Sequence, residues 1–187
     1  MEIYQPSEDS FLMYRTIKEE LKNIRTKDIK FLEIGVGSGI NLFAALNSGI
    51  KKENIIGTDI NEKAVNLCKG MGFNCIKSDL FKKVKGKFDL IVFNPPYLPL
   101  DKREPLESRI STSAGLKGNE IIIKFLNQAK KHLKKNGKIF LIVSSLSKKI
   151  DFEKLGYLKR ILNSEKFFFE EIFVLELKLK NNNTISS

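Results

Sequence analysis

Short apolar segments alternate with amphipathic segments along almost the whole chain, and this alternation is the strongest constraint on its fold. Strands that alternate with helices form a parallel sheet with helices packed against it. We expect seven strands, at 31–34, 54–58, 73–77, 88–93 and 138–143, with two more between 157 and 179. The run 88–93 is apolar in the manner of a buried parallel strand. The sequence therefore predicts an α/β fold.

The helices that complete this pattern are predicted from start signals and from apolar residues spaced three or four apart. We expect them at 7–23, 42–46, 62–69 and 119–133. Ser7 can cap the first helix, and Glu8 and Asp9 suit its first turn. The chain shows no internal repeat or linker, so we expect one domain over 1–180. The polar tail 181–187 is expected to be disordered.

Composition limits the function classes. Of the 187 residues, 42% are hydrophobic, but no apolar run is long enough to span a bilayer, and the first residues lack signal-peptide character. We therefore expect a cytoplasmic protein. Cys68 and Cys75 with a single histidine cannot complete a four-ligand zinc site, so no metal is predicted. The net charge of +11 favours acidic partners such as RNA or DNA, but the lysines are spread along the chain. Nucleic acid is therefore a secondary expectation.

Acidic residues end three successive predicted strands. Glu33 precedes the glycine-rich loop Gly35–Gly39, Asp59 ends the second strand and Asp79 follows the third. Ligands of parallel sheets bind at the carboxyl ends of the strands, where glycines allow the backbone to approach them. Asp59 can accept both hydroxyls of a ribose, and Asp79 an adenine amino group, with Leu80 against the ring. The pattern predicts a site for a nucleoside.

The motif Asn94-Pro95-Pro96-Tyr97 follows the fourth predicted strand at once. Two prolines stiffen the backbone and remove N–H donors, so the carbonyls of Asn94 and Pro95 can serve as fixed acceptors. With the Asn94 side chain they suit an NH₂ group on a flat conjugated system, and Tyr97 supplies an aromatic contact. Such a nitrogen is a weak nucleophile, and positioning with fixed dipoles is what it needs.

These motifs resemble those of the class I S-adenosylmethionine-dependent methyltransferases, and within them the HemK family. The segment Tyr4–Leu12 resembles the N-terminal motif of the archaeal and eukaryotic branch, and Ala114–Gly118 resembles a Gly-Gly-x-x-Gly segment. The resemblance implies a Rossmann-like, seven-stranded, mostly parallel sheet with a C-terminal antiparallel strand and helices on both faces. It implies S-adenosyl-L-methionine as cofactor and S-adenosyl-L-homocysteine as product. The implied cofactor-binding residues are Ser10, Glu33, Ile34, Gly35, Gly37, Asp59, Ile60, Asp79, Leu80 and Asn94; the implied catalytic residues are Asn94, Pro95, Pro96 and Tyr97.

The same resemblance implies an acceptor and a partner. The family methylates the glutamine of the Gly-Gly-Gln loop of class 1 translation release factors, and members of this branch pair with a small zinc-binding activator protein beside the third strand. Phe73, Cys75 and Ile76 lie there, and either receive the activator or merely pack the sheet edge. Ala114 departs from the family's glycine, which leaves the acceptor open. An amino methyltransferase acting on RNA or DNA is the alternative, since adenine carries an equally flat NH₂ group.

Overall fold

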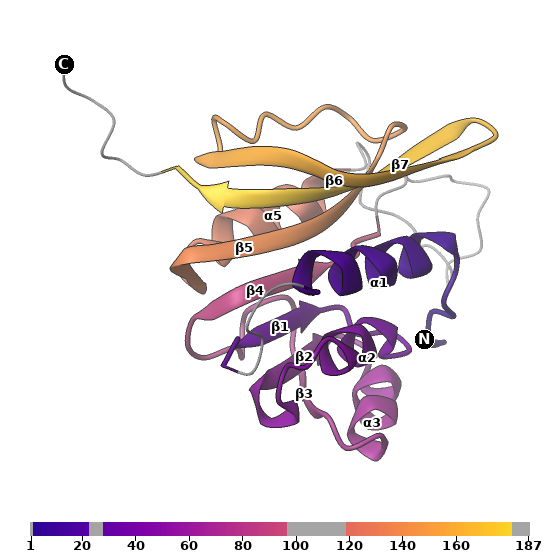
Figure 1. The fold of residues 1–187 in the computed structure, drawn as a ribbon, viewed down its shortest axis with the longest axis vertical. Coiled ribbons are helices and arrows are strands. Elements are labelled where there is room, and N and C mark those ends of the chain that lie inside the picture. The colour runs from indigo at the N-terminus through magenta and orange to yellow at the C-terminus, as the bar shows by residue number, and fades with distance from the viewer. Residues whose placement is uncertain (1, 23–27, 97–118, 181–187) are drawn as a thin grey trace.

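The computed structural model describes residues 2–22, 28–96 and 119–180. Tyr97, the segment 98–118 and the tail 181–187 lie outside the described residues, as does the predicted end of the first helix at Asn23. Seven strands form one sheet in the order β3-β2-β1-β4-β5-β7-β6 (Figure 1). Their bounds are β1 Phe31–Ile34, β2 Ile55–Asp59, β3 Asn74–Lys77, β4 Phe88–Phe93, β5 Leu133–Ser144, β6 Tyr157–Phe167 and β7 Glu170–Leu179.

The strand directions agree with the expected sheet. Strands β1 to β5 pair with one another in parallel. Strand β7 is inserted between β5 and β6 and runs antiparallel to both. The prediction of a mostly parallel seven-stranded sheet with an antiparallel strand near the C-terminus is therefore confirmed.

Helices cover both faces of the sheet. The helices α1 (Glu8–Leu21), α2 (Ile40–Asn47) and α3 (Glu62–Gly70) lie on one face, and α5 (Glu120–Ala129) lies on the other (Figure 1). Successive side chains of a strand point to opposite faces of the sheet and so contribute to the hydrophobic core on each face. Phe31 of β1 faces α1 and α2, whereas its neighbour Leu32 faces the α5 side. A short 3₁₀ helix, Lys52–Asn54, precedes β2. No helix among the described residues is long and apolar enough to cross a membrane.

The helix predicted to run to Leu133 ends at Ala129, and β5 begins at Leu133. The lysine-rich stretch after Ala129 has good helix propensity, but Leu133 instead pairs with Phe88 of β4 and is buried with it. The pairing then shifts, so that Lys138 is opposite Leu90. Burial of an apolar side chain against the sheet has overridden local propensity here.

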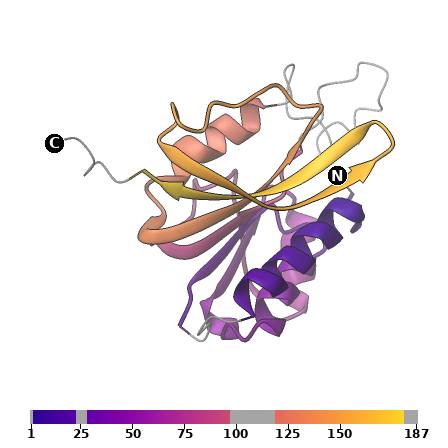
Figure 2. The same ribbon diagram turned by 45° about the horizontal axis from the view of Figure 1, so that its top comes forward.

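The carboxyl ends of the parallel strands share one edge of the sheet, and the N-terminal end of α1 lies at this edge (Figure 2). Ser7 occupies the position before the helix, as predicted, but its hydroxyl makes no backbone cap. It donates instead to Asp9 Oδ1 over 2.7 Å. The first turn of α1 is thus organised around Asp9, next to the loops that follow β1, β2 and β4.

Candidate functional site

A glycine-rich loop joins β1 to α2 at the carboxyl edge. Gly37 and Gly39 have positive φ angles of 49° and 84°, which favour glycine. The loop lies close to β2, because the N–H groups of Gly35 and Val36 both donate to the Thr58 carbonyl, over 2.7 and 3.0 Å. Gly35 and Gly37 are half-buried in this loop, and their role in binding a ligand stays a prediction.

Asp59 ends β2 beside this loop. Its Oδ2 accepts from the Gly37 N–H over 3.0 Å and its Oδ1 from the Asn61 N–H over 2.8 Å. Burial raises the pKa of Asp59, while these backbone hydrogen bonds act against that rise. Each carboxylate oxygen can accept more than one hydrogen bond, so the fixed carboxylate retains capacity for a diol. The neighbouring Ile60 is 56% exposed, which leaves an apolar side chain open to a flat ring.

Glu33 is buried at the end of β1. Its Oε1 accepts from Asn41 Nδ2 over 2.9 Å, and its Oε2 has no partner among the described residues. Burial raises the pKa of Glu33 well above its usual range, more than the Asn41 hydrogen bond lowers it. Asn41, in the first turn of α2, was not predicted at the site, because it lies just before the helix expected over 42–46 and no local pattern links it to Glu33. Ile34, also predicted at the site, is buried in the α5-side core.

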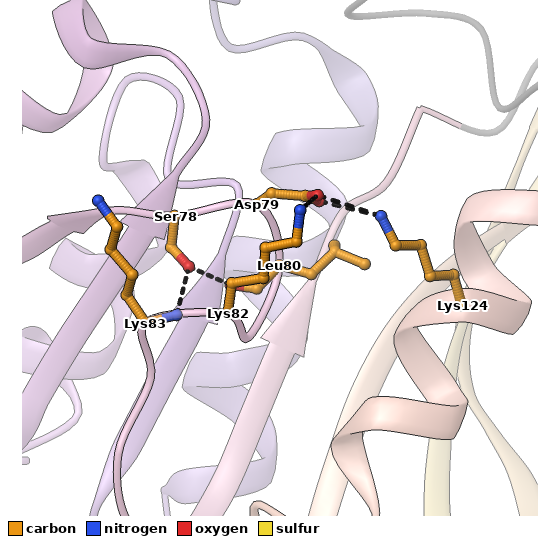
Figure 3. A network of polar contacts seen from close by, with 6 residues as sticks. All are labelled: Ser78, Asp79, Leu80, Lys82, Lys83 and Lys124. Atoms are coloured by element: carbon orange, nitrogen blue, oxygen red, sulfur yellow. Dashed lines mark hydrogen bonds and ion pairs between the residues drawn. The ribbon is translucent and has the colours of Figure 1, made fainter.

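Asp79 follows β3 and is held by two lysines rather than left open (Figure 3). Lys82 Nζ lies 2.8 Å from its Oδ2, and Lys124 Nζ of α5 lies 3.2 Å from its Oδ1. The Lys82 hydrogen bond, with a smaller contribution from Lys124, lowers the pKa of Asp79. The structure therefore places Asp79 at the predicted edge, in contact with lysines that sequence reasoning did not connect to it.

The turn that carries Asp79 has an unusual backbone. Leu80 has a φ of 49°, which is uncommon for a residue with a branched side chain, and its side chain is nonetheless buried. The Ser78 hydroxyl holds the turn, donating to the Leu80 carbonyl over 2.9 Å and accepting from the Lys83 N–H over 3.0 Å (Figure 3). Backbone strain of this kind concentrates at functional sites, which fits the predicted place of Leu80.

Asn94 follows β4 and is joined to the first helix. Its Nδ2 donates to Asp9 Oδ2 over 3.1 Å, across 85 positions of sequence. A carboxylate accepts and an amide NH₂ donates, so this contact fixes which way the Asn94 amide points. Asn94 Oδ1 is then turned away from Asp9, and it is buried without a partner among the described residues. Pro95 is buried and Pro96 half-buried directly after it.

Asp9 is itself tightly held. Its Oδ1 accepts from the Ser7 hydroxyl over 2.7 Å, the Ser10 N–H over 2.5 Å and the Ser10 hydroxyl over 3.1 Å, and the Tyr4 hydroxyl lies 3.3 Å from both oxygens. Ser10, a predicted cofactor-binding residue, is therefore hydrogen-bonded to Asp9 through its N–H and its hydroxyl. The sequence predicts Asp9 only as a first-turn acid, and its place in the Tyr4–Leu12 motif is the signal that could identify it as a site residue.

The polar side chains at the ends of β1 and β4 lie on the same face of the sheet as α1. Glu33 is opposite Val92 in the β1–β4 register, and Asn94 is two positions further, so both side chains lie on the face covered by α1 and α2. Glu33 and Asn94 each bring a buried oxygen without a partner there. Buried polar atoms in native proteins are nearly always hydrogen-bonded, so a ligand that offers N–H donors suits this site. The described residues contain no group of three metal-ligating side chains.

Comparison with known proteins shows which family this chain belongs to. The family model described as Eco57I restriction-modification methylase matches residues 71–172, from before β3 to near the start of β7. A candidate protein N5-glutamine methyltransferase of Methanocaldococcus jannaschii, MJ0928, is 37% identical over 186 residues, which cover 93% of this chain and 90% of the relative.

Two solved structures share the fold. The Mtq2 chain of the E. cuniculi Mtq2–Trm112 complex, described as responsible for methylation of the translation termination factor eRF1, superposes with a TM-score of 0.71. The two chains are 22% identical in sequence, and their alignment covers 97% of this chain and 100% of that one. The T. thermophilus 16S rRNA N2 G1207 methyltransferase, in complex with AdoMet and guanosine, gives a TM-score of 0.64 at 18% identity, over 95% of this chain and 44% of that one. The sheet is therefore that of the class I S-adenosylmethionine-dependent methyltransferases. Because the 37% identity extends over nine-tenths of both chains, the protein belongs to the HemK family of protein N5-glutamine methyltransferases.

Proposed function

We propose that this protein transfers a methyl group from S-adenosyl-L-methionine to the side-chain amide nitrogen of a glutamine in a class 1 translation release factor. The observation that carries the proposal is the buried, unpartnered Oδ1 of Asn94, whose direction is fixed by the hydrogen bond from Nδ2 to Asp9. A primary amide offers an N–H donor for that oxygen. Family membership and the eRF1-modifying structural relative support the same acceptor.

The residues at the carboxyl edge fit the cofactor. Asp59 would accept the ribose hydroxyls, and the Gly35–Gly39 loop would let the methionine part approach the backbone. Glu33 Oε2, buried and unpartnered, is suited to the positively charged amino group of that part. Ser10, Ile34, Ile60, Asp79 and Leu80 complete the proposed cofactor site; Asp79 would exchange a lysine contact for the adenine amino group. When bound, the cofactor supplies a methyl group on a positively charged sulfur.

Asn94, Pro95 and Pro96 would hold the acceptor amide, with Tyr97, which lies outside the described residues, as the proposed aromatic contact. Asn94 Oδ1 and the Pro95 carbonyl would accept hydrogen bonds from the two N–H groups of the amide. These bonds would increase the electron density on the amide nitrogen and align it with the methyl carbon. The amide nitrogen then forms the new C–N bond while the C–S bond breaks. It afterwards releases one proton to solvent, so no titratable base is required before transfer.

The test is methyl transfer from labelled S-adenosylmethionine. Acceptors are the release factor, its Gly-Gly-Gln→Gly-Gly-Asn variant, and total RNA. Label on the release factor that is lost in the variant supports the proposal. The asparagine side chain is one carbon shorter, so its amide would not reach Asn94 Oδ1 and the Pro95 carbonyl. Absence of label on the release factor, with the cofactor bound, contradicts it.

An amino methyltransferase acting on RNA or DNA is the second candidate. The match to a restriction-modification methylase model over 71–172, which includes Asn94–Pro96, favours it, as does the net charge of +11. An exocyclic NH₂ of a base would meet the same acceptors, but a base in a duplex would first have to be flipped out. Label on RNA alone in the experiment above would instead identify the protein as an amino methyltransferase that acts on RNA.

We further propose that a small zinc-binding activator pairs with this chain along β3. This strand is at the end of the sheet, and among the described residues β2 is its one neighbour. Cys75 and Phe73 are buried there, Ile76 is half-buried, and the adjacent Phe43 and Leu67 are 37% and 38% exposed. The structural relative was solved with the partner Trm112, which supports a partner here. The chain alone should be poorly soluble or weakly active, and full activity of a pure monomer on release factor would contradict the pairing.

A further inference from the structure

The hairpin of β6 and β7 ends in two phenylalanines that are not buried against any of the described residues. Phe168 and Phe169 connect the paired residues Phe167 and Glu170, and their side chains are 105% and 93% exposed. Phe168 also has a positive φ of 25°. Two-residue hairpin connections favour glycine, asparagine or aspartate, because these residues tolerate positive φ. Within the part of the chain that the structure describes, neither backbone geometry nor burial explains two aromatic residues at these positions.

The tip lies at the catalytic edge of the sheet. Strand β7 runs antiparallel to β5 and β6, so β6 runs in the direction of β5 and of the parallel strand β4. The end of β6 at Phe167 is therefore at the same edge as Asn94, on the side where α1 begins (Figures 1 and 2). An ion pair of 2.5 Å between Arg15 and Glu165 connects α1 to β6 close to the tip.

The tip is braced by the end of β5. The Ser144 hydroxyl donates to Glu170 Oε1 over 2.5 Å, and the Glu171 N–H donates to the Ser145 hydroxyl over 2.9 Å. The Ser145 N–H donates to the Glu171 carbonyl over 2.8 Å. The backbone next to the two phenylalanines is thus held at Glu170 and Glu171, and ordering a held turn on binding costs less conformational entropy than ordering a mobile one.

We infer that Phe168 and Phe169 form a docking contact for the protein that carries the acceptor glutamine, a contact that binds an apolar recess on that protein. The inference rests on the proposed function. Buried aromatic anchors dominate protein interfaces, and this pair stands at the edge where the acceptor must enter. The flanking residues 165–171 include three glutamates and one lysine, and Arg15 pairs with one of the glutamates, so the tip remains slightly acidic although the chain as a whole carries a net charge of +11. This local charge disfavours the phosphates of a nucleic acid.

The position also separates this contact from the proposed activator. Strands β3 and β6 are the two ends of the seven-stranded sheet. An activator seated on β3 therefore leaves the tip of the β6–β7 hairpin open to the substrate protein.

The test compares F168A/F169A with the wild-type chain, each co-expressed with the activator. A matched control is L158A/I161A, since Leu158 and Ile161 are 53% and 58% exposed on the same strand but lie away from the tip. Steady-state methylation is measured on intact release factor and on a synthetic peptide that contains the Gly-Gly-Gln sequence. We expect the tip variant to raise KM for release factor roughly ten- to hundredfold, as for loss of aromatic anchors, with kcat unchanged. The control variant should match the wild type.

Activity of the tip variant on the peptide should equal that of the wild type, because the peptide lacks the docking surface. Equal KM values for wild type and tip variant on release factor would overturn the inference and leave the proposed function intact. So would a change from dimer to monomer in solution with KM unchanged, which would make the tip a contact between copies of this chain. A wild type that methylates neither acceptor would overturn the proposed function, and the inference with it.

Discussion

Replacing Asp9 with asparagine removes a negative charge from the group that holds Asn94, while it keeps the size of the side chain. Asp9 can only accept, so in the wild type Nδ2 of Asn94 must face it and Oδ1 must face the acceptor. An asparagine at position 9 both donates and accepts, so it no longer specifies one orientation of the Asn94 amide. The negative charge that polarises this amide is lost as well.

The size of the effect follows from the distances. The Asp9–Asn94 hydrogen bond is 3.1 Å long, and a second bond of about 2.9 Å would join Asn94 Oδ1 to the acceptor nitrogen. The carboxylate then lies roughly 7 Å from that nitrogen, which gains positive charge as the methyl group is transferred. At an effective dielectric constant of about 20, a unit charge and a half charge at this distance interact by about 1.2 kcal/mol. We therefore expect Asp9→Asn to lower kcat about tenfold.

The assay is steady-state methylation of release factor, with cofactor affinity measured separately by calorimetry. Glu8→Gln is the matched control, because it removes the same charge from the adjacent, exposed position of α1. Asp9→Ala should be more severe, since it leaves the Asn94 NH₂ without this acceptor, at a cost of about 1–3 kcal/mol. If Asp9→Asn turned over as fast as Glu8→Gln, or lost activity only through cofactor affinity, the orienting role of Asp9 would be refuted.

Three further substitutions test the site. Asn94→Ala should retain cofactor binding but lose roughly 10²-fold or more in turnover, as when one fixed polar group is deleted; near-normal turnover would remove Asn94 from catalysis. Asp59→Ala should weaken cofactor binding in calorimetry, and unchanged affinity would remove Asp59 from the ribose site. Because burial raises the pKa of Glu33, the fold loses stability as pH rises from its ordinary value of 4.5 towards the raised one. Glu33→Gln should therefore raise Tm by an amount that grows with pH over this range, about 2–4 °C for each kcal/mol recovered; a gap independent of pH would argue against this account.

Local sequence patterns were sufficient to predict seven strands and the edge where the candidate site residues gather, although β5 begins at Leu133 and not at 138. An apolar run that stops at Glu33, Asp59 or Asn94 fixes both a strand and its polar end, because the parallel arrangement brings such ends to one edge. The same reasoning failed for the end of α5, where buried pairing of Leu133 with Phe88 replaced the expected last helical turn.

Contacts between distant elements could not be predicted in this way. Asp9 and Asn94 are 85 positions apart, and Lys124 reaches Asp79 across 45. A local pattern tells which face of its own element a side chain occupies, but not which side chain of another element it meets. Asp9 therefore looked like an ordinary helix-start acid, and Asp79 like a free acceptor.

The insertion of β7 between β5 and β6 has a consequence for the synthesis of the chain. Translation proceeds from the N-terminus at about 5–20 residues per second, so both residues of the Asp9–Asn94 pair are made early. The outer edge of β5 and the whole of β6 have no neighbour in the sheet until Glu170–Leu179 has been made. Until then a nascent chain exposes the apolar residues that Val174, Leu175 and Leu177 later help to bury. We therefore expect exposure of apolar surface, and with it the tendency to aggregate, to be greatest late in synthesis, after β1 to β4 have been made.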